Sequence, residues 1–289
     1  MTRRYFALYL TLTPGIGGRT VTRVLNRNDM LSRSPEAFLS LSPEALREEY
    51  GLRLDAAERI AASGKAGAAK VLDEQKRLVA LGVTLVTQAD AHYPSVIEEM
   101  DPDPPNVLFF YGNHKLLSAN TYSVLSSRNT SLAGLDEIEK LTEDGVLKGE
   151  VLVSSDNRPE YQRSALVPLR WGAPRILCLD RGLFEVLGPD LKDEPFRAAR
   201  LWRYQFDPTT DLVISPFRPE AKFSGVNNQV RDRLVACLSR RLDFVEIAPT
   251  GNMEKLAKLA LKAGRAVRVS DRSINYRRLK EIGAEVISV

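Results

Sequence analysis

A run of small polar residues with one arginine follows an apolar stretch at residues 122–125. It reads SSRNTS over residues 126–131, and a helix is predicted to begin near Leu135. In a doubly wound α/β fold, free backbone amides and the positive end of a helix dipole meet at such a loop, which favours anions. We expect Ser127 and Ser131 to position a phosphate and Arg128 to chelate it. The alternative is that these residues only cap the helix.

A second polar cluster reads NNQVRDR over residues 227–233 and runs into an apolar helical stretch at 234–238. Amide and guanidinium groups together suit backbone phosphates and base edges, so Asn228, Arg231 and Arg233 are candidate nucleic-acid contacts. Asp232 supports the alternative that the arginines pair within the chain. Four nearby aromatic residues either stack on unpaired bases or belong to the core: Trp202, Tyr204, Phe217 and Phe223.

The turn LTPGIGG at residues 12–18 joins two apolar helical stretches. Its glycines permit the tight backbone with which a helix-hairpin-helix presents amides to a phosphate. An ordinary turn between helices uses glycine for the same conformational reason, so both interpretations stand.

The charge is unevenly distributed along the chain. The net charge is +4, yet residues 197–280 alone carry 18 basic and 8 acidic side chains. Such an excess indicates either a solvated basic surface or a footprint for a polyanion.

The composition argues against several classes of protein. With two cysteines and two histidines, no metal-ligand cluster of recognisable spacing can be assembled, and Cys178 and Cys237 look like core residues. The apolar runs fall far short of the roughly 20 residues that a bilayer-spanning helix needs. The N-terminus lacks a signal-peptide pattern. We therefore predict a cytoplasmic protein with no cofactor, metal or membrane partner.

The elements that must position these residues divide the chain in two. Residues 1–65 show helical spacing, Ser42 and Pro43 resemble a helix start, and 61–67 is predicted as a linker before a helix at 68–80. Short apolar runs then alternate with helix-length segments, which indicates βαβ units. The strands are predicted at 83–87, 107–111, 122–125, 151–154, 176–179, 212–215, 244–247, 266–269 and 286–288. We predict a small helical domain (1–65, helix-hairpin-helix or SAM-like) and an α/β domain (66–289, Rossmann-like, doubly wound, with a mainly parallel sheet).

These landmarks, taken in order, resemble the DprA/Smf family of DNA-processing proteins. The turn LTPGIG (12–17) is similar to the family's N-terminal turn, and HYPSV (92–96) followed by DPPNVLFFYGN (103–113) is similar to its most specific stretch. Ser127-Arg128 with Ser131 falls on the family's "GSRxxS" phosphate loop. The resemblance continues through RDRLVACLS (231–239), DFVEIA (243–248) and NYRRL with GAEV (275–279, 283–286).

The departures from the family pattern lie near the expected site. Ser126 replaces the first glycine of "GSR", and Asp232 replaces the asparagine of "RNR". The segment SSDNRPEYQRSAL (154–166) stands where the family has "SGlA.GID..AH..AL", without its glycines and histidine. We therefore expect any small-nucleotide site formed by the backbone of residues 154–158 to be weak or absent. Arg163 from this altered loop is a further candidate DNA contact.

The resemblance implies a single-stranded DNA-binding protein of DNA processing and recombination. It further implies a homodimer that loads a RecA-type recombinase and has no enzymatic activity. Two alternatives remain open: a nucleotide-sensing Rossmann-like module and a scaffold for protein partners. A phosphoribohydrolase of similar architecture is disfavoured because its "PGGxGT" segment is missing from the sequence.

Overall fold

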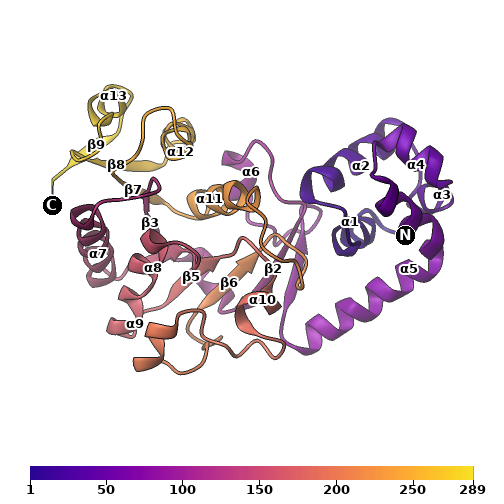
Figure 1. Cartoon of the computed structure of the whole chain (residues 1–289), viewed down its shortest axis with the longest axis horizontal. Helices are drawn as coiled ribbons and strands as arrows, with labels where there is room; N and C mark the ends of the chain where they lie inside the picture. The colour runs from indigo at the N-terminus through magenta and orange to yellow at the C-terminus, as the bar shows by residue number, and fades with distance from the viewer. Residues whose placement is uncertain (289) are drawn as a thin grey trace.

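Five helices occupy the N-terminal part of the chain, on the right of Figure 1. The computed structural model describes residues 1–288, apart from the side chains of Lys65, Ala68 and Arg200. The helices are α1 (Arg3–Leu12), α2 (Gly18–Met30), α3 (Pro35–Leu39), α4 (Pro43–Tyr50) and α5 (Leu54–Ala80). The Ser42 hydroxyl accepts a hydrogen bond from the amide of Ala45, and Pro43 occupies the first turn of α4. The predicted helix start at Ser42 is therefore confirmed.

The segment predicted as a linker lies instead inside α5. Residues 61–67 belong to this helix, which is kinked at Gly64, where φ is 42° and ψ is −131°. Gly67 is packed against α1, because a Cβ at this position would lie 3.2 Å from a ring carbon of Tyr9. The glycine of the supposed linker thus permits close packing between two helices.

A mixed nine-stranded sheet follows, in the order β1-β2-β6-β5-β4-β3-β7-β8-β9. Its strands are β1 (Thr84–Thr87), β2 (Val107–Gly112), β3 (Thr121–Ser126), β4 (Val151–Ser154), β5 (Arg175–Cys178), β6 (Leu212–Ser215), β7 (Arg241–Val245), β8 (Ala266–Ser270) and β9 (Glu285–Ile287). From β6 to β9 all neighbouring strands are parallel, whereas β2 is antiparallel to both β1 and β6. The prediction of an α/β, mainly parallel sheet is confirmed.

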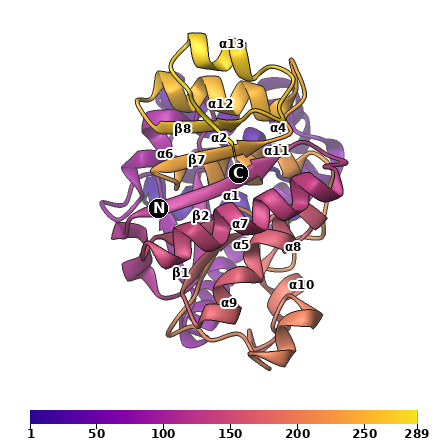
Figure 2. The same ribbon diagram turned by 90° about the vertical axis from the view of Figure 1, so that its left-hand side faces the viewer.

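Helices cover both faces of the sheet, because side chains alternate between its faces along each strand. In β2, Phe109 packs into the cluster that contains the N-terminal helices, while Leu108 and Phe110 pack into the cluster on the opposite face. The connecting helices are α6 (Ser95–Met100), η1 (His114–Ser118), α7 (Leu132–Leu147), α8 (Pro159–Ala165), α9 (Val167–Trp171), α10 (Leu183–Leu187), η2 (Arg197–Leu201), α11 (Asn227–Cys237), α12 (Asn252–Lys262) and α13 (Tyr276–Glu281). Figure 2 shows α7, α8 and α9 in front of the sheet, with α12 and α13 above them.

Strand β7 begins and ends earlier than the predicted range 244–247. Its pairing with β3 starts at Tyr122 opposite Arg241, and the strand stops at Val245. The next residue, Glu246, has a φ of 47°, a left-handed conformation that takes the chain out of the strand. This turn carries Glu246 toward α7, which matters for the site.

Cys178 and Cys237 are both buried and unpaired, which confirms their predicted place in the core. Burial raises the pKa of the Cys237 thiol to about 12. Among residues 1–288, no group of three or more histidine, cysteine, aspartate or glutamate side chains is arranged to hold a metal ion. Within the same residues, no helix has both the length and the apolar character to cross a membrane.

Candidate nucleic-acid interface

The loop between β3 and α7 holds itself in one conformation. The Thr130 hydroxyl lies 2.9 Å from both the Ser127 carbonyl and the Ser126 hydroxyl, and its hydrogen is shared between these two acceptors. The Ser127 hydroxyl accepts a hydrogen bond of 2.7 Å from the amide of Ala248, just beyond β7. Arg128 projects from this fixed loop and is exposed, with no ion pair to any of the residues described. A free guanidinium on a rigid loop is well placed to bind an anion.

The positive end of α7 is already occupied by a carboxylate of the chain itself. Ser131 caps the helix by accepting a hydrogen bond from Gly134, and its own amide and hydroxyl donate to Glu246 at 2.8 and 2.5 Å. A carboxylate is stabilised there for the same reason that a phosphate would be. The expected phosphate contact by Ser131 therefore needs correction, because Glu246 takes up both of its donors.

A small pocket of about 240 Å³ lies beside this loop at the carboxyl ends of the parallel strands. Two cations line it, Arg128 after β3 and Arg158 after β4. Its remaining lining residues come from the loop before α11, from α11 itself and from the start of α12, with one more from the β3–α7 loop: Ser127, Gly225, Asn228, Gln229, Asp232, Asn252 and Met253. Because β4 and β7 flank β3, the pocket sits where strand order reverses, the usual ligand position in doubly wound sheets.

Arg231 does not reach this pocket as a DNA contact. Its side chain has 0% exposure, and it donates at 2.8 Å to Asn228, at 2.8 Å to Ser155 and at 2.7 Å to Asp232. A guanidinium with its donors engaged in the interior cannot approach a phosphate. The prediction for Arg231 is corrected, since this residue supports the floor of the pocket from below.

The buried network around Arg231 also fixes Asp232. The Asp232 carboxylate accepts hydrogen bonds from the Tyr161 hydroxyl at 2.8 Å and from Asn252 at 3.1 Å. Burial, and then the charge of Asp232, raise the pKa of Tyr161, so its phenol stays protonated and donates. The alternative interpretation, that Asp232 pairs with a neighbouring arginine, is the one the structure supports.

Of the other predicted contacts, Arg163 and Arg233 lie apart from the small pocket. Arg163 forms ion pairs of 2.7 Å with Asp136 and Glu139 on α7, which commits its charge to joining α7 and α8. Arg233 is mostly buried and pairs with Asp101 at 2.8 Å. Asn228 lines the pocket, but its amide oxygen accepts from Arg231. Ser127, Arg128 and Asn228 are thus the predicted residues that the structure brings together.

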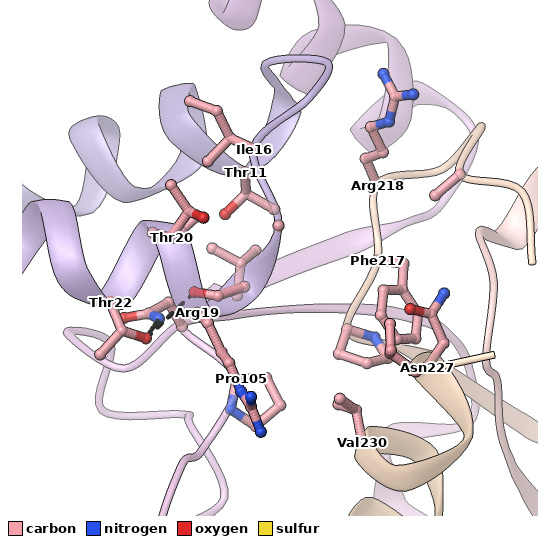
Figure 3. Close-up of a pocket in the computed structure, with 18 of the residues that line it drawn as sticks. Thr11, Ile16, Arg19, Thr20, Thr22, Pro105, Phe217, Arg218, Asn227 and Val230 are labelled. Carbon is pink, nitrogen blue, oxygen red and sulfur yellow. Dashed lines mark hydrogen bonds between the residues drawn. The ribbon is translucent and has the colours of Figure 1, made fainter. Parts of the chain in front are cut away.

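A larger pocket of about 660 Å³ adjoins the first one, since Gln229 lines both. In Figure 3 it lies between side chains of α1 and α2 on one side and residues 217–230 on the other, with Pro105 below. The glycine turn at residues 15–18 contributes to its wall. Of the four candidate aromatic residues, Phe217 lines this pocket, whereas Trp202, Tyr204 and Phe223 are about half or more exposed outside it.

Sequence reasoning missed Arg158, Arg19, Arg218 and Lys222. Arg158 follows β4 as Arg128 follows β3, and in a parallel sheet the ends of adjacent strands share one edge. That shared edge was the available signal. Arg19 is distant in sequence from Arg218 and Lys222, and the two segments come together only around the larger pocket.

Comparisons with known proteins bear on this site. Residues 84–155 match the family model of DNA recombination-mediator protein A. Among curated protein sequences, no relative was found. The predicted resemblance to the DprA family is borne out over these residues, a range that includes β3 and the Ser127-Arg128 loop.

Two solved structures share the fold. DNA processing protein A from Streptococcus pneumoniae matches with a TM-score of 0.68 and 22% identity, over 99% of this chain and 95% of that one. DNA processing protein A from Helicobacter pylori, whose structure is described as showing a single-stranded DNA binding mode, matches with a TM-score of 0.55 and 18% identity. That match covers 71% of this chain and 90% of the other.

Proposed function

We propose that this DprA-family chain binds single-stranded DNA and acts in DNA processing or recombination. The observation that carries the proposal is the pairing of Arg128 and Arg158 around one small pocket at the carboxyl edge of the parallel strands. Neither guanidinium forms an ion pair within the part of the chain described, so both are available to a ligand. The family match and the single-stranded DNA binding described for the H. pylori protein support the same conclusion.

The chemistry of the pocket suits a phosphodiester. Two guanidinium groups can donate charge-assisted hydrogen bonds to one phosphate from both sides, and the exposed Gln229 supplies a neutral polar contact. A volume of about 240 Å³ is below the range typical of drug-sized ligands, which fits a short piece of backbone. The role that we propose for this pocket is to bind DNA, without a chemical step.

The test replaces Arg128 and Arg158 with alanine, singly and together. Each change should weaken binding of a labelled single-stranded oligonucleotide by about 1–3 kcal/mol, because one charge-assisted hydrogen-bonding group is removed. Each should also reduce the log–log salt slope by about 0.7 for every phosphate that the variant no longer neutralises. Fluorescence anisotropy at several salt concentrations measures both quantities.

The matched control is Arg240→Ala. Arg240 is exposed, and it precedes β7 at the amino edge of the sheet, opposite the pocket. Its replacement removes the same charge and should leave affinity nearly unchanged. Equal affinities for all variants and the wild type would remove the pocket from the DNA path. Tight binding of a free nucleotide without oligonucleotide binding would favour the nucleotide-sensing alternative.

Family resemblance also supports a homodimer and a RecA-type recombinase as partner, which we propose on that ground. The exposed side chains of Ile274 (86%) and Ile282 (49%) near the β9 edge give an apolar surface that self-association would cover. Light scattering across micromolar concentrations tests the dimer, and a strictly monomeric mass would contradict it.

A further inference from the structure

The larger pocket combines apolar walls with cationic side chains in its lining. Its volume of about 660 Å³ falls within the range of small-molecule sites. One wall comes from the α1–α2 turn and α2, the other from residues 216–230, and the floor from residues 103–107. Figure 3 shows Phe217 and Val230 on one side facing Ile16 and Thr20 across the space, with Pro105 below.

Phe217 is held in place at this wall. The amide of Phe217 donates to the Ser215 hydroxyl at 3.1 Å, and that hydroxyl donates in turn to the carbonyl of Arg181 at 2.8 Å. The ring is half-buried and lines the pocket together with Pro105 and Val230. An aromatic ring carried by a hydrogen-bonded backbone in an apolar wall can serve as a stacking platform for a planar base.

Polar groups on the floor of the pocket can form hydrogen bonds with the edge of a stacked nucleobase. Asn106 donates to the Thr22 hydroxyl at 2.7 Å, which joins the floor to α2. The Asn106 amide oxygen accepts no hydrogen bond from the residues that the structure describes, and the side chain of Gln229 is likewise without a described partner. An acceptor and an amide are thus available beside the stacking wall.

Cationic side chains line the pocket at two ends, with Arg19 beside Pro105 and Arg218 at the opposite end in Figure 3. Arg218 and Lys222 form no ion pairs with other described residues, and Arg19 reaches Asp103 only at 3.4 Å while 84% of its side chain stays exposed. Arg233 is neutralised by Asp101. The net positive charge of the lining therefore favours the phosphates that flank the base.

The glycine turn leaves room for a ligand. A Cβ built at Gly17 or Gly18 would meet no atom within 4 Å, so the protein's own packing does not require glycine at either position. Helix α2 begins here without a side-chain cap and without an acidic residue in its first turn. These features add to the cationic lining.

We infer that the pocket between α2 and α11 binds one nucleotide unit of a strand, with its base against Phe217 and the flanking phosphates toward Arg19 at one end and Arg218 at the other. The inference rests on the proposed function in one respect, because Gln229 connects this pocket to the Arg128 pocket and a single strand can occupy both. The N-terminal helices then form part of the DNA interface. The same chemistry would also accept a free nucleotide.

Three variants test the site. Phe217→Ala removes the stacking ring, Gly18→Leu fills open space beside the ligand, and Phe223→Ala is the control, because Phe223 is an exposed aromatic residue of the same loop outside both pockets. Without one stacked base, oligonucleotide binding should weaken roughly 5-fold to 100-fold. Gly18→Leu should weaken binding as well, and Phe223→Ala should leave it unchanged.

The ligands are a deoxythymidine oligonucleotide, the same oligonucleotide with a single abasic position moved along it, and deoxythymidine monophosphate. We expect one abasic position to weaken wild-type binding as much as Phe217→Ala does, and to add nothing in that variant. If Phe217→Ala weakens binding of the mononucleotide but not of the oligonucleotide, the pocket binds a free nucleotide. The inference then holds, with a free nucleotide as the ligand.

Two outcomes separate this inference from the proposed function. Unchanged affinities for both ligands in Phe217→Ala and Gly18→Leu, alongside weakened DNA binding in Arg128→Ala, would overturn the pocket assignment and leave DNA binding intact. The wild type could instead bind the mononucleotide but no oligonucleotide, with Phe217→Ala abolishing the mononucleotide binding. That result would overturn the proposed DNA binding and leave the assignment of the larger pocket intact. Thermal melting by circular dichroism checks that each variant is folded.

Discussion

Glu246 occupies the place at the start of α7 where an anion would otherwise bind. Its carboxylate accepts from Ser131, and a Cβ at Gly134 would lie 2.7 Å from the Glu246 carboxyl carbon, so a side chain at that position would displace the carboxylate. The negative charge stands beside the same loop as Arg128. A bound phosphate must therefore work against it, unless the carboxylate moves away.

The replacement Glu246→Gln should strengthen single-stranded DNA binding about 2-fold to 5-fold, since a charge at a helix terminus is worth about 0.3–1 kcal/mol. Anisotropy titration at low salt measures the gain. Glu48→Gln is the control, because Glu48 is exposed on α4 and carries the same charge. An equal gain in both variants would assign the effect to net charge alone.

Arg231 and Arg128 look alike in sequence and differ completely in burial. Removing one partner of a buried ion pair costs about 3–5 kcal/mol, so Arg231→Met should lower the free energy of unfolding by that amount. Arg128→Ala, at an exposed position, should change it by less than about 0.5 kcal/mol. Urea unfolding of the two variants distinguishes them, and similar stabilities would contradict the buried role of Arg231.

The burial of Arg231 could have been predicted from its spacing relative to apolar residues, although its charge suggested an exposed position. Leu234 and Val235 follow it by three and four residues, which places all three on one helix face, and both are fully buried. The exposed position of Arg128 was predictable because the residue lies in a loop after a strand, outside any apolar periodicity. Glu246 was not, because its contact with Ser131 spans 115 residues.

At the scale of elements, short apolar runs predicted the strands well, and local capping residues predicted helix starts such as Ser42. Glycine residues were a less reliable indicator of where an element ends. Gly64 and Gly67 indicated a linker, but one marks a kink within α5 and the other a close contact with Tyr9. Tertiary packing determined the structure there, and a single sequence carries little of that information.

The corner between α12 and α13 depends on one carboxylate. Burial alone would raise the pKa of Glu254, but hydrogen bonds from Lys258, the Thr250 amide and Asn275 lower it to about 2. Because the folded-state pKa is below its usual value of 4.5, the stabilisation is present above that pH and is lost as pH falls toward about 2.

Glu254→Gln mimics the protonated side chain and should isolate this effect. The wild type should melt at a higher temperature than the variant at neutral pH, and the difference should shrink between about pH 4.5 and 2. Thermal melts in a series of buffers provide the measurement. A difference that stays constant over this range would show that Glu254 acts by its shape alone.

The whole molecule is built around a core that crosses the predicted domain boundary. One cluster of buried side chains contains Phe6 and Leu10 of α1 together with Leu85, Phe109 and Val213 of the sheet. An ion pair of 2.9 Å between Arg4 and Asp90, and the Asn106–Thr22 hydrogen bond, connect the same two parts. The walls of the larger pocket are therefore held at a fixed separation, which favours a preformed binding site over one that closes on its ligand.

A fragment of residues 66–289 tests whether the predicted boundary separates units that fold independently. Cutting there removes the α1 side chains that cover Leu85 and Phe109, and burial of each such residue contributes about 1.5–3 kcal/mol. Since 1 kcal/mol shifts the melting temperature of a domain this size by about 2–4 °C, we expect the fragment to melt about 10 °C or more below the full chain. We also expect the full chain to unfold in one calorimetric transition. Two transitions in the full chain, with the fragment melting at the temperature of one of them, would instead mean that the shared core contributes little and that the pocket walls can move apart.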